Sequence, residues 1–135
     1  SISGMKYYVS RLLEMYRNYK CLYEIDNDWG GFEWINANDA DRGIYTFLRK
    51  CPSSRKGLMF VLNMTPVKYE GFRMGVPVNK RYKLILNSTD KQFGGFGDTP
   101  VPEIIRPKKG LCDFRDQYIE FDLPAYGGLV FEYSY

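Results

Sequence analysis

The chain has 135 residues, which points to one domain, and 19 Lys and Arg against 16 Asp and Glu leave a net charge of +3. That charge is too small and too mixed for a nucleic-acid binder, and no apolar run reaches the roughly 20 residues of a membrane-spanning helix. The chain contains no histidine, which excludes Ser-His and Cys-His catalysis and zinc sites with imidazole ligands.

The N-terminal region contains the one clear helix candidate. Over residues 5–19, apolar and aromatic side chains recur at steps of three and four and form one stripe along the predicted helix. The stripe consists of Met5, Tyr8, Val9, Leu12, Leu13, Tyr16 and Tyr19. A helix with such a face must bury it against another part of a protein. Because the first residues lack the apolar segment of a signal peptide, we expect a cytoplasmic location.

An acidic and aromatic segment follows at residues 22–41. It carries six acidic side chains and no basic one, and a Gly-Gly pair interrupts any regular element. Its large rings are Trp29, Phe32 and Trp34. Asp26, Asp28 and Gly31 are similar to the start of a calcium loop, but Ala37 stands where that loop needs a bidentate glutamate. We therefore expect a connecting loop that holds no metal.

From residue 42 onward the pattern is typical of β-strands. The expected strands span 44–49, 58–64, 69–74, 81–87, 117–123 and 129–133, with a short one near Ile104. Residues 58–64 are apolar except for Asn63, as in a central strand that is covered on both faces. About seven strands separated by turns rich in Gly and Pro predict a mainly β fold, an antiparallel β-sandwich preceded by one amphipathic helix.

The sequence offers few groups for catalysis. The close carboxylate pairs are Asp26 with Asp28 and Asp39 with Asp41, and both pairs lie in the predicted connecting loop. The three cysteines, Cys21, Cys51 and Cys112, are too widely spaced for a Cys-x-x-Cys site, and we expect reduced thiols. Asn63 and Asn87 each begin an Asn-x-Thr triplet, and Asn63 is expected to end a strand before the chain turns at Pro66.

Several short blocks occur in an order that is typical of one family. They are residues 11–13, 21–26, 31–35 (Gly-Phe-Glu-Trp-Ile) with 38–41, 63–67 (Asn-Met-Thr-Pro-Val), 72–77 (Phe-Arg-Met-Gly-Val-Pro), 82–90 with 93–95, and 123–124 (Leu-Pro). Each block resembles the corresponding segment of bacterial glycogen branching enzymes, which are glycoside hydrolases of the α-amylase type. Two departures, Met64 for Phe and Ala125-Tyr126 for Pro-Leu, are those of altered packing.

The resemblance implies a fragment of a longer enzyme. Residues 1–21 would be the last helix of a missing catalytic barrel, 22–41 a connecting loop and 42–135 a C-terminal all-β domain. The parent polypeptide would be a 1,4-α-glucan branching enzyme, a glycosyltransferase that cleaves α-1,4 glucan and rejoins the chain through an α-1,6 bond. It would use a retaining mechanism with two close carboxyl groups and no cofactor or metal. The fragment alone is expected to be inactive, because those carboxyl groups would lie on the barrel.

The expected partners are the barrel of the same chain and an α-glucan such as glycogen or amylose, but no nucleic acid and no membrane. Trp34 is the first glucan-binding candidate, followed by Phe32 and Trp29, because an aromatic face can stack on a glucose ring. These rings could instead seal the junction between barrel and β domain. A free-standing carbohydrate-binding module and an interaction domain of immunoglobulin-like architecture stay open as alternatives.

Overall fold

The computed structural model describes residues 7, 9–11, 33–36, 42–51, 54–89 and 97–135. Tyr7 and residues 9–11 are helical, in agreement with the helix predicted over 5–19, and the other residues of that helix lie outside the described part. Val9 belongs to the predicted apolar stripe and is buried. Within the described residues, no helix has the length and apolar character needed to cross a membrane.

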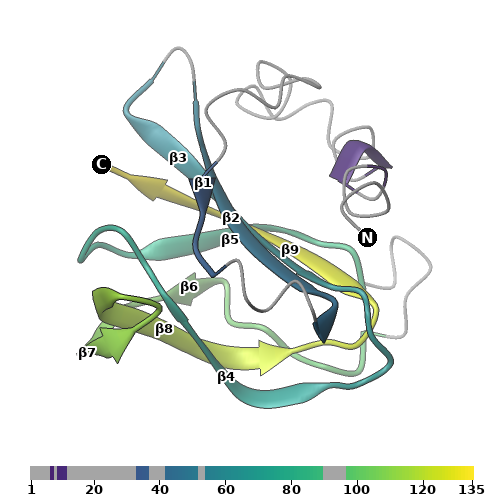
Figure 1. The fold of residues 1–135 in the computed structure, drawn as a ribbon. Helices are drawn as coiled ribbons and strands as arrows, with labels where there is room; N and C mark the ends of the chain where they lie inside the picture. Colours follow the sequence, from purple (N-terminus) through teal and green to yellow (C-terminus); the bar gives the residue numbers. More distant parts are fainter. Residues whose placement is uncertain (1–6, 8, 12–32, 37–41, 52–53, 90–96) are drawn as a thin grey trace.

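A six-stranded antiparallel sheet forms the larger layer (Figure 1). Across the sheet, its strands are β1 (Glu33–Trp34), β2 (Ile44–Lys50), β3 (Lys56–Asn63), β9 (Gly127–Ser134), β5 (Tyr82–Asn87) and β6 (Ile104–Ile105). The C-terminal strand β9 therefore lies in the interior of the sheet, between β3 and β5. This order brings chain segments that are far apart in sequence into neighbouring positions.

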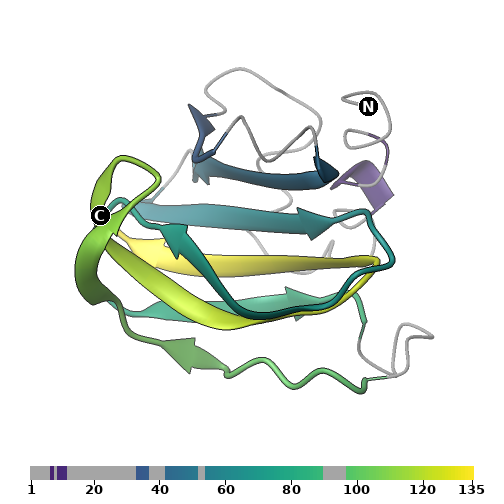
Figure 2. The same cartoon turned by 60° about the horizontal axis from the view of Figure 1, so that its bottom comes forward.

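A three-stranded antiparallel sheet forms the second layer. Its order is β4 (Tyr69–Gly75), β8 (Arg115–Leu123) and β7 (Lys108–Cys112). Figure 2 shows β4 and β8 passing in front of the strands of the larger sheet, so the smaller sheet covers one face of it. We refer to that covered face as the inner face of the six-stranded sheet and to the opposite face as its outer face.

The hydrophobic core lies between the two layers. Because side chains alternate along a strand, each sheet contributes every second residue to this space. The core includes Met59, Val61, Leu129 and Phe131 from the six-stranded sheet and Phe72, Met74, Ile119 and Phe121 from the three-stranded sheet. All eight are buried. This arrangement confirms the predicted antiparallel β-sandwich.

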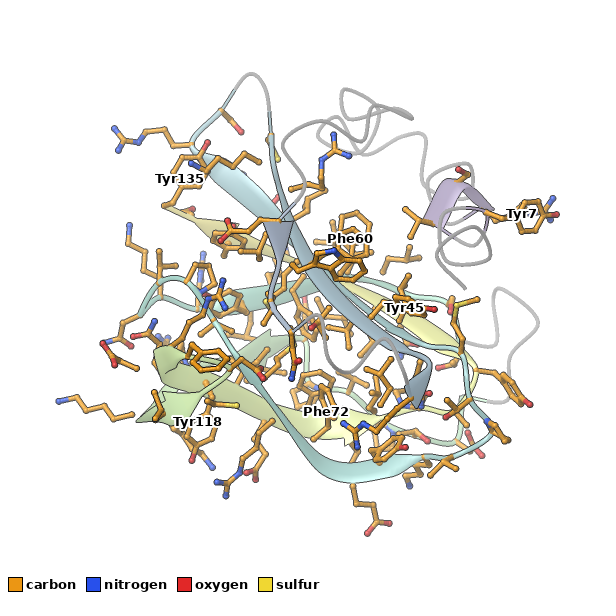
Figure 3. The ribbon with its side chains drawn as sticks, in the orientation of Figure 1. Tyr7, Tyr45, Phe60, Phe72, Tyr118 and Tyr135 are labelled. Atoms are coloured by element: carbon orange, nitrogen blue, oxygen red, sulfur yellow. The ribbon has the colours of Figure 1, made fainter. Side chains whose placement is uncertain are left out.

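The outer face of the six-stranded sheet is also apolar and buried. Its side chains are Tyr45, Phe47, Leu58, Phe60, Leu62, Leu86 and Val130. Figure 3 shows Phe72 between the sheets, whereas Phe60 and Tyr45 lie on the other side of the larger sheet. The double burial predicted for residues 58–64 is confirmed for β3, and it extends to its neighbour β2.

The seven predicted strands are all present, and two further strands accompany them. β1 has only two residues and is held by its pairing with β2, so it produces no pattern of its own. β7 has the sequence Lys-Lys-Gly-Leu-Cys, which lacks an apolar run, and most of it is not buried. It is a strand because it forms one arm of the hairpin with β8.

Both Asn-x-Thr triplets form the same hydrogen-bonded turn. The Asn63 Oδ1 atom accepts hydrogen bonds from the amide and hydroxyl of Thr65, at 3.1 and 2.6 Å. Its Nδ2 group donates to the carbonyl oxygens of Val67 and Pro124, at 2.7 and 3.0 Å. Asn87 repeats the first pair of bonds with Thr89. Asn63 thus ends its strand as predicted, and both asparagines are buried structural residues.

Candidate functional site

Trp34 is the one member of the predicted site that the structure describes. It lies in β1, at the edge of the six-stranded sheet and opposite Phe47. The centroid of its ring is 6.0 Å from that of Tyr45 and 6.0 Å from that of Phe47, and the contact with Phe47 is edge-on at 78°. Trp29 and Phe32 lie outside the described residues, so the structure does not bring the three rings together.

Trp34 borders the aromatic cluster of the outer face. Behind it, Phe47 and Phe60 stack with centroids 4.8 Å apart and planes within 6°. Both phenylalanines are almost completely buried, whereas Trp34 is half-buried. The Trp34 ring therefore has fixed aromatic partners and keeps part of its surface accessible. This position is compatible with a sealing role and with a stacking contact to a ligand.

A network of polar contacts fixes the strand that carries Trp34. The Arg115 Nη2 group lies 3.4 Å from Oε1 of Glu33, and Nη1 donates to the carbonyl oxygens of Ile35 and Asp113, at 3.4 and 3.2 Å. The Asp113 carboxylate in turn accepts a hydrogen bond from Nδ2 of Asn36, at 2.8 Å. These contacts connect β1 and the residues after it to the hairpin between β7 and β8.

The same hairpin is closely packed against β4. Asp113 Oδ2 accepts a hydrogen bond from the Gly75 amide, at 2.8 Å. A Cβ atom at Gly75 would lie against the Cys112 carbonyl oxygen, so only glycine permits this approach. Asp113 and Phe114 form the tight turn of the hairpin, with φ angles of 52° and 63°. The hairpin is therefore anchored to both sheets.

A groove of about 270 Å³ opens beside Glu33, on the other side of β1 from Trp34. Its charged groups are Glu33 and Lys50, and its rings are Tyr133 and Tyr135. The Lys50 ammonium group lies 5.0 Å from the centroid of the Tyr135 ring, within the range of a cation–π interaction. A ring, a carboxylate and an ammonium group are the kinds of group that bind the faces and hydroxyls of a sugar.

Tyr133 forms the floor of this groove. Its ring packs over Gly57, where no side chain would fit, and burial raises the pKa of its hydroxyl to about 12. Tyr135 is more accessible, and its hydroxyl donates to the carbonyl oxygen of Ser54 at 3.2 Å. Neither tyrosine was among the site candidates predicted from the sequence. The available signal was the alternation of Phe131, Tyr133 and Tyr135, which places three rings on one face of the last strand.

The acidic side chains of the described residues were compared with the groups expected from the sequence. Among them, no three side chains of His, Cys, Asp or Glu are placed to bind a metal ion. The two carboxylate pairs singled out in the sequence, at residues 26 and 28 and at 39 and 41, lie outside the described part of the chain. The carboxylates of Glu33, Asp113 and Glu120 are held in the ion pairs and hydrogen bonds of the fold.

The cysteines differ from the expectation in one respect. Cys51, at the end of β2, is buried and disulfide-bonded, so the prediction of reduced thiols is wrong for this residue. Cys112 is free, and burial together with the neighbouring Asp113 carboxylate raises the pKa of its thiol. Disulfides are rare in reducing compartments, so the bond at Cys51 argues against the expected cytoplasmic location. That location stays a prediction.

The described residues form a domain of two packed antiparallel β-sheets. Residues 34–134 match the family described as alpha amylase, C-terminal all-beta domain, and the chain belongs to this family. It is 53% identical over 131 residues to the 1,4-alpha-glucan branching enzyme GlgB of Butyrivibrio fibrisolvens, an alignment that covers 97% of this chain and 20% of that protein.

Other branching enzymes are similar over nearly the same length. The identity is 37% over 124 residues to the GlgB protein of Geobacillus stearothermophilus, which covers 92% of this chain and 19% of that protein. It is 36% over 123 residues to that of Desulfitobacterium hafniense, covering 91% and 19%. The chain spans about a fifth of the length of these curated relatives. The resemblance to bacterial glycogen branching enzymes is thereby confirmed.

Proposed function

We propose that this chain forms the C-terminal domain of a 1,4-α-glucan branching enzyme. The observation that carries the proposal is the 53% identity to such an enzyme along 97% of the chain, although the chain spans only 20% of that enzyme. The whole protein would cleave an α-1,4 glucan and transfer the released chain to form an α-1,6 branch. The expected role of this domain is to stabilise the catalytic barrel that precedes it.

The chemistry of the parent enzyme would reside outside this chain. A retaining glycosyl transfer needs a nucleophilic carboxylate and an acid–base carboxyl group about 5–5.5 Å apart. The described carboxylates Glu33 and Glu120 each bind an arginine, an arrangement typical of structural ion pairs. We therefore propose that residues 1–135 are inactive alone and that both catalytic carboxyl groups belong to the upstream barrel.

A segment exchange tests this proposal. The part of the Butyrivibrio fibrisolvens enzyme that aligns with this chain would be replaced by residues 1–135, and branching of amylose would be followed by iodine staining. We expect the chimera to be active, the same enzyme without the segment to lose most of its activity, and residues 1–135 alone to be inactive. Activity of the isolated chain that Asp26→Asn or Asp39→Asn abolishes would contradict the proposal.

We further propose that the domain holds α-glucan at the β1 edge of the six-stranded sheet. Trp34 on one side of β1, and Tyr135 with Glu33 and Lys50 on the other, support this role because both sides offer accessible aromatic surface. Phe32 and Trp29 stay candidates that share the same segment of sequence. A single stacking contact contributes on the order of 1–2 kcal/mol, equivalent to about tenfold in affinity.

Two variants separate glucan contact from sealing. Trp34→Ala and Tyr135→Ala would be compared with Tyr126→Ala, which removes an exposed ring far from β1 along the chain. Melting temperature and maltoheptaose affinity would be measured for each. The proposal expects weaker binding in the first two variants only. A lower melting temperature with unchanged affinity for both variants would assign these rings to packing.

Full glucan binding by residues 1–135 together with an inactive chimera would favour a free-standing carbohydrate-binding module.

A further inference from the structure

A second groove, of about 470 Å³, lies at one end of the six-stranded sheet. It is distinguished by its charge. Five of its lining residues are cations, namely Lys56, Lys80, Arg81, Lys83 and Arg106. Glu132 is the one acidic residue among the described side chains that line it. We call this feature the basic groove. Its volume is in the range of pockets that hold small molecules.

Strand register brings the basic groove together. Lys83 of β5 lies opposite Glu132 of β9, and Lys56 of β3 lies opposite Ser134 of β9. Tyr82 pairs with Ile105 of β6, so the residue before Tyr82 and the residue after Ile105, both arginines, extend the row beyond the strand ends. Cationic side chains from β3, β5 and the residue after β6 therefore meet at one end of the sheet, on either side of β9, which contributes Glu132. The pairing of these strands therefore fixes the backbone positions from which the side chains extend.

This concentration of charge is suited to an anion. The five cationic side chains are exposed, and repulsion among them is unfavourable unless counter-charge is present. A cleft lined by one sign of charge raises the local concentration of ligands of the opposite sign. Arginine presents two parallel N–H donors to phosphate oxygens, and lysine adds a point charge. The groove contains both kinds of donor.

Glu132 adds a second property to the basic groove, a preference for ligands that carry hydroxyl groups. Its Oε1 atom lies 3.5 Å from the Lys56 ammonium group, whereas its Oε2 atom is buried and has no hydrogen-bond partner in the described part of the chain. Burial raises the pKa of this carboxyl group. A largely buried carboxylate with too few donors is costly, and a ligand hydroxyl group that binds the accessible part of this carboxylate would add one. A carboxylate also repels a bare anion, which favours ligands that carry hydroxyl groups beside their charge.

We propose that the basic groove binds a small sugar phosphate. The phosphate group binds the arginine and lysine side chains, and a sugar hydroxyl donates to the Glu132 carboxylate group. The groove and the proposed glucan contact lie on different sets of residues, with only Tyr133 lining both. The proposal therefore does not depend on glucan binding, and either can fail alone.

Titration of residues 1–135 tests the assignment. Inorganic phosphate, glucose 1-phosphate and glucose would each be added at about 150 mM salt, where the screening length is about 8 Å, and binding would be followed by calorimetry. We expect glucose 1-phosphate to bind more tightly than inorganic phosphate and glucose not to bind in this groove. Equal affinities for glucose 1-phosphate and inorganic phosphate, or binding of neither, would overturn the proposal.

Matched charge variants locate the site. Arg81→Gln with Lys83→Gln removes two cations from the basic groove, and Lys108→Gln with Lys109→Gln removes two exposed cations from β7. We expect the first pair to weaken glucose 1-phosphate binding by about tenfold or more and the second pair to leave it nearly unchanged, because direct charge-assisted hydrogen bonds are lost only in the first. Equal weakening by both pairs would mean a general charge effect and would overturn the proposal.

Glu132→Gln provides a test with opposite signs. Removal of the carboxylate charge lowers repulsion, so inorganic phosphate should bind more tightly. Loss of the strong acceptor for a hydroxyl group should at the same time reduce the preference for glucose 1-phosphate over phosphate. Thermal unfolding of each variant would verify that it is folded. An unchanged preference in Glu132→Gln would contradict the role given to the Glu132 carboxylate group.

Discussion

The inner and outer faces of the six-stranded sheet are built from alternate residues of the same strands, yet they differ in how they treat polar atoms. Each face holds one buried side-chain oxygen without a hydrogen-bond partner among the described residues. On the inner face it is Oγ1 of Thr46, which lies between the core residues Ile44 and Leu48 along β2. On the outer face it is Oε2 of Glu132, which lines the basic groove.

The two unpaired oxygens differ in their surroundings. Thr46 is 1% exposed, so no ligand can reach its hydroxyl group, and the missing hydrogen bond only lowers stability. The Oε2 atom of Glu132 is also buried, but the Glu132 side chain is 14% exposed and lines the basic groove, so its carboxylate group borders a space that a ligand can enter. The same kind of unpaired oxygen therefore lies inside the closed core on one face and beside a groove on the other.

The largest expected effect comes from removing one ring on each face. Phe131→Ala and Phe60→Ala delete side chains that are 0% and 1% exposed, so each should lower the free energy of unfolding by about 3–5 kcal/mol. Urea unfolding of both variants would measure this. Near-equal losses would mean that the outer face is packed as firmly as the inner one. A loss at Phe60 well below that at Phe131 would contradict a firmly covered outer face.

The next effect concerns the contacts that hold β1 against the hairpin. Arg115→Gln removes the hydrogen bonds to Ile35 and Asp113 and the ion pair with Glu33, and it should lower the free energy of unfolding by about 1–2 kcal/mol. Arg73→Gln is the control. Its ion pair with Glu120 is shorter, at 2.7 Å, but it is exposed, so little change is expected. A larger loss for Arg73→Gln would reverse this ranking.

A smaller effect, of the opposite sign, is expected at Thr46, whose hydroxyl group on the inner face has no hydrogen-bond partner among the described residues. Thr46→Val replaces the hydroxyl group that lacks a partner by a methyl group of similar size, so the free energy of unfolding should rise by about 1 kcal/mol. Thermal and urea unfolding would measure the gain. Thr46→Ser, which keeps the hydroxyl group and removes the methyl group, should be destabilised. Destabilisation by Thr46→Val would mean that the hydroxyl group is satisfied in solution.

The smallest effect appears only at alkaline pH. The pKa of Tyr133 is raised from 10.0 to about 12, so the unfolded chain loses this proton at lower pH than the folded chain. Stability should therefore be full below pH 10 and fall as the pH rises towards 12. Tyr133→Phe should make this fall shallower, whereas Tyr126→Phe, at an exposed ring, should not alter it. Identical pH profiles for wild type and Tyr133→Phe would refute the shift.

Local patterns predicted the parts of the fold that depend on local chemistry. The run at 58–64, apolar except for Asn63, predicted a strand buried on both faces because such a run leaves no polar side for water. Asn63 predicted the end of that strand because its side chain satisfies the backbone of the turn. Short collinear blocks, each weak alone, predicted the family because their order along the chain is specific.

The sites that depend on strand order could not be predicted in this way. Lys56, Lys83 and Glu132 are far apart in sequence and meet only because β9 inserts between β3 and β5. The groove beside Glu33 likewise forms only because the C-terminal residues Tyr133 and Tyr135 lie close to Glu33 and Lys50. Trp34 was chosen from its position in the acidic and aromatic segment between the predicted helix and the β domain, and such a position does not tell whether a ring packs or binds.

Both outermost strands of the six-stranded sheet, β1 and β6, are only two residues long. An exposed edge strand offers unpaired amides and carbonyls on which a second chain can add a strand, and a very short edge offers few of them. The long strands β3 and β9, which combine apolar character with β propensity, lie in the interior of the sheet. The domain can therefore be concentrated, or carried as part of a larger protein, with little tendency to form fibrils through this sheet.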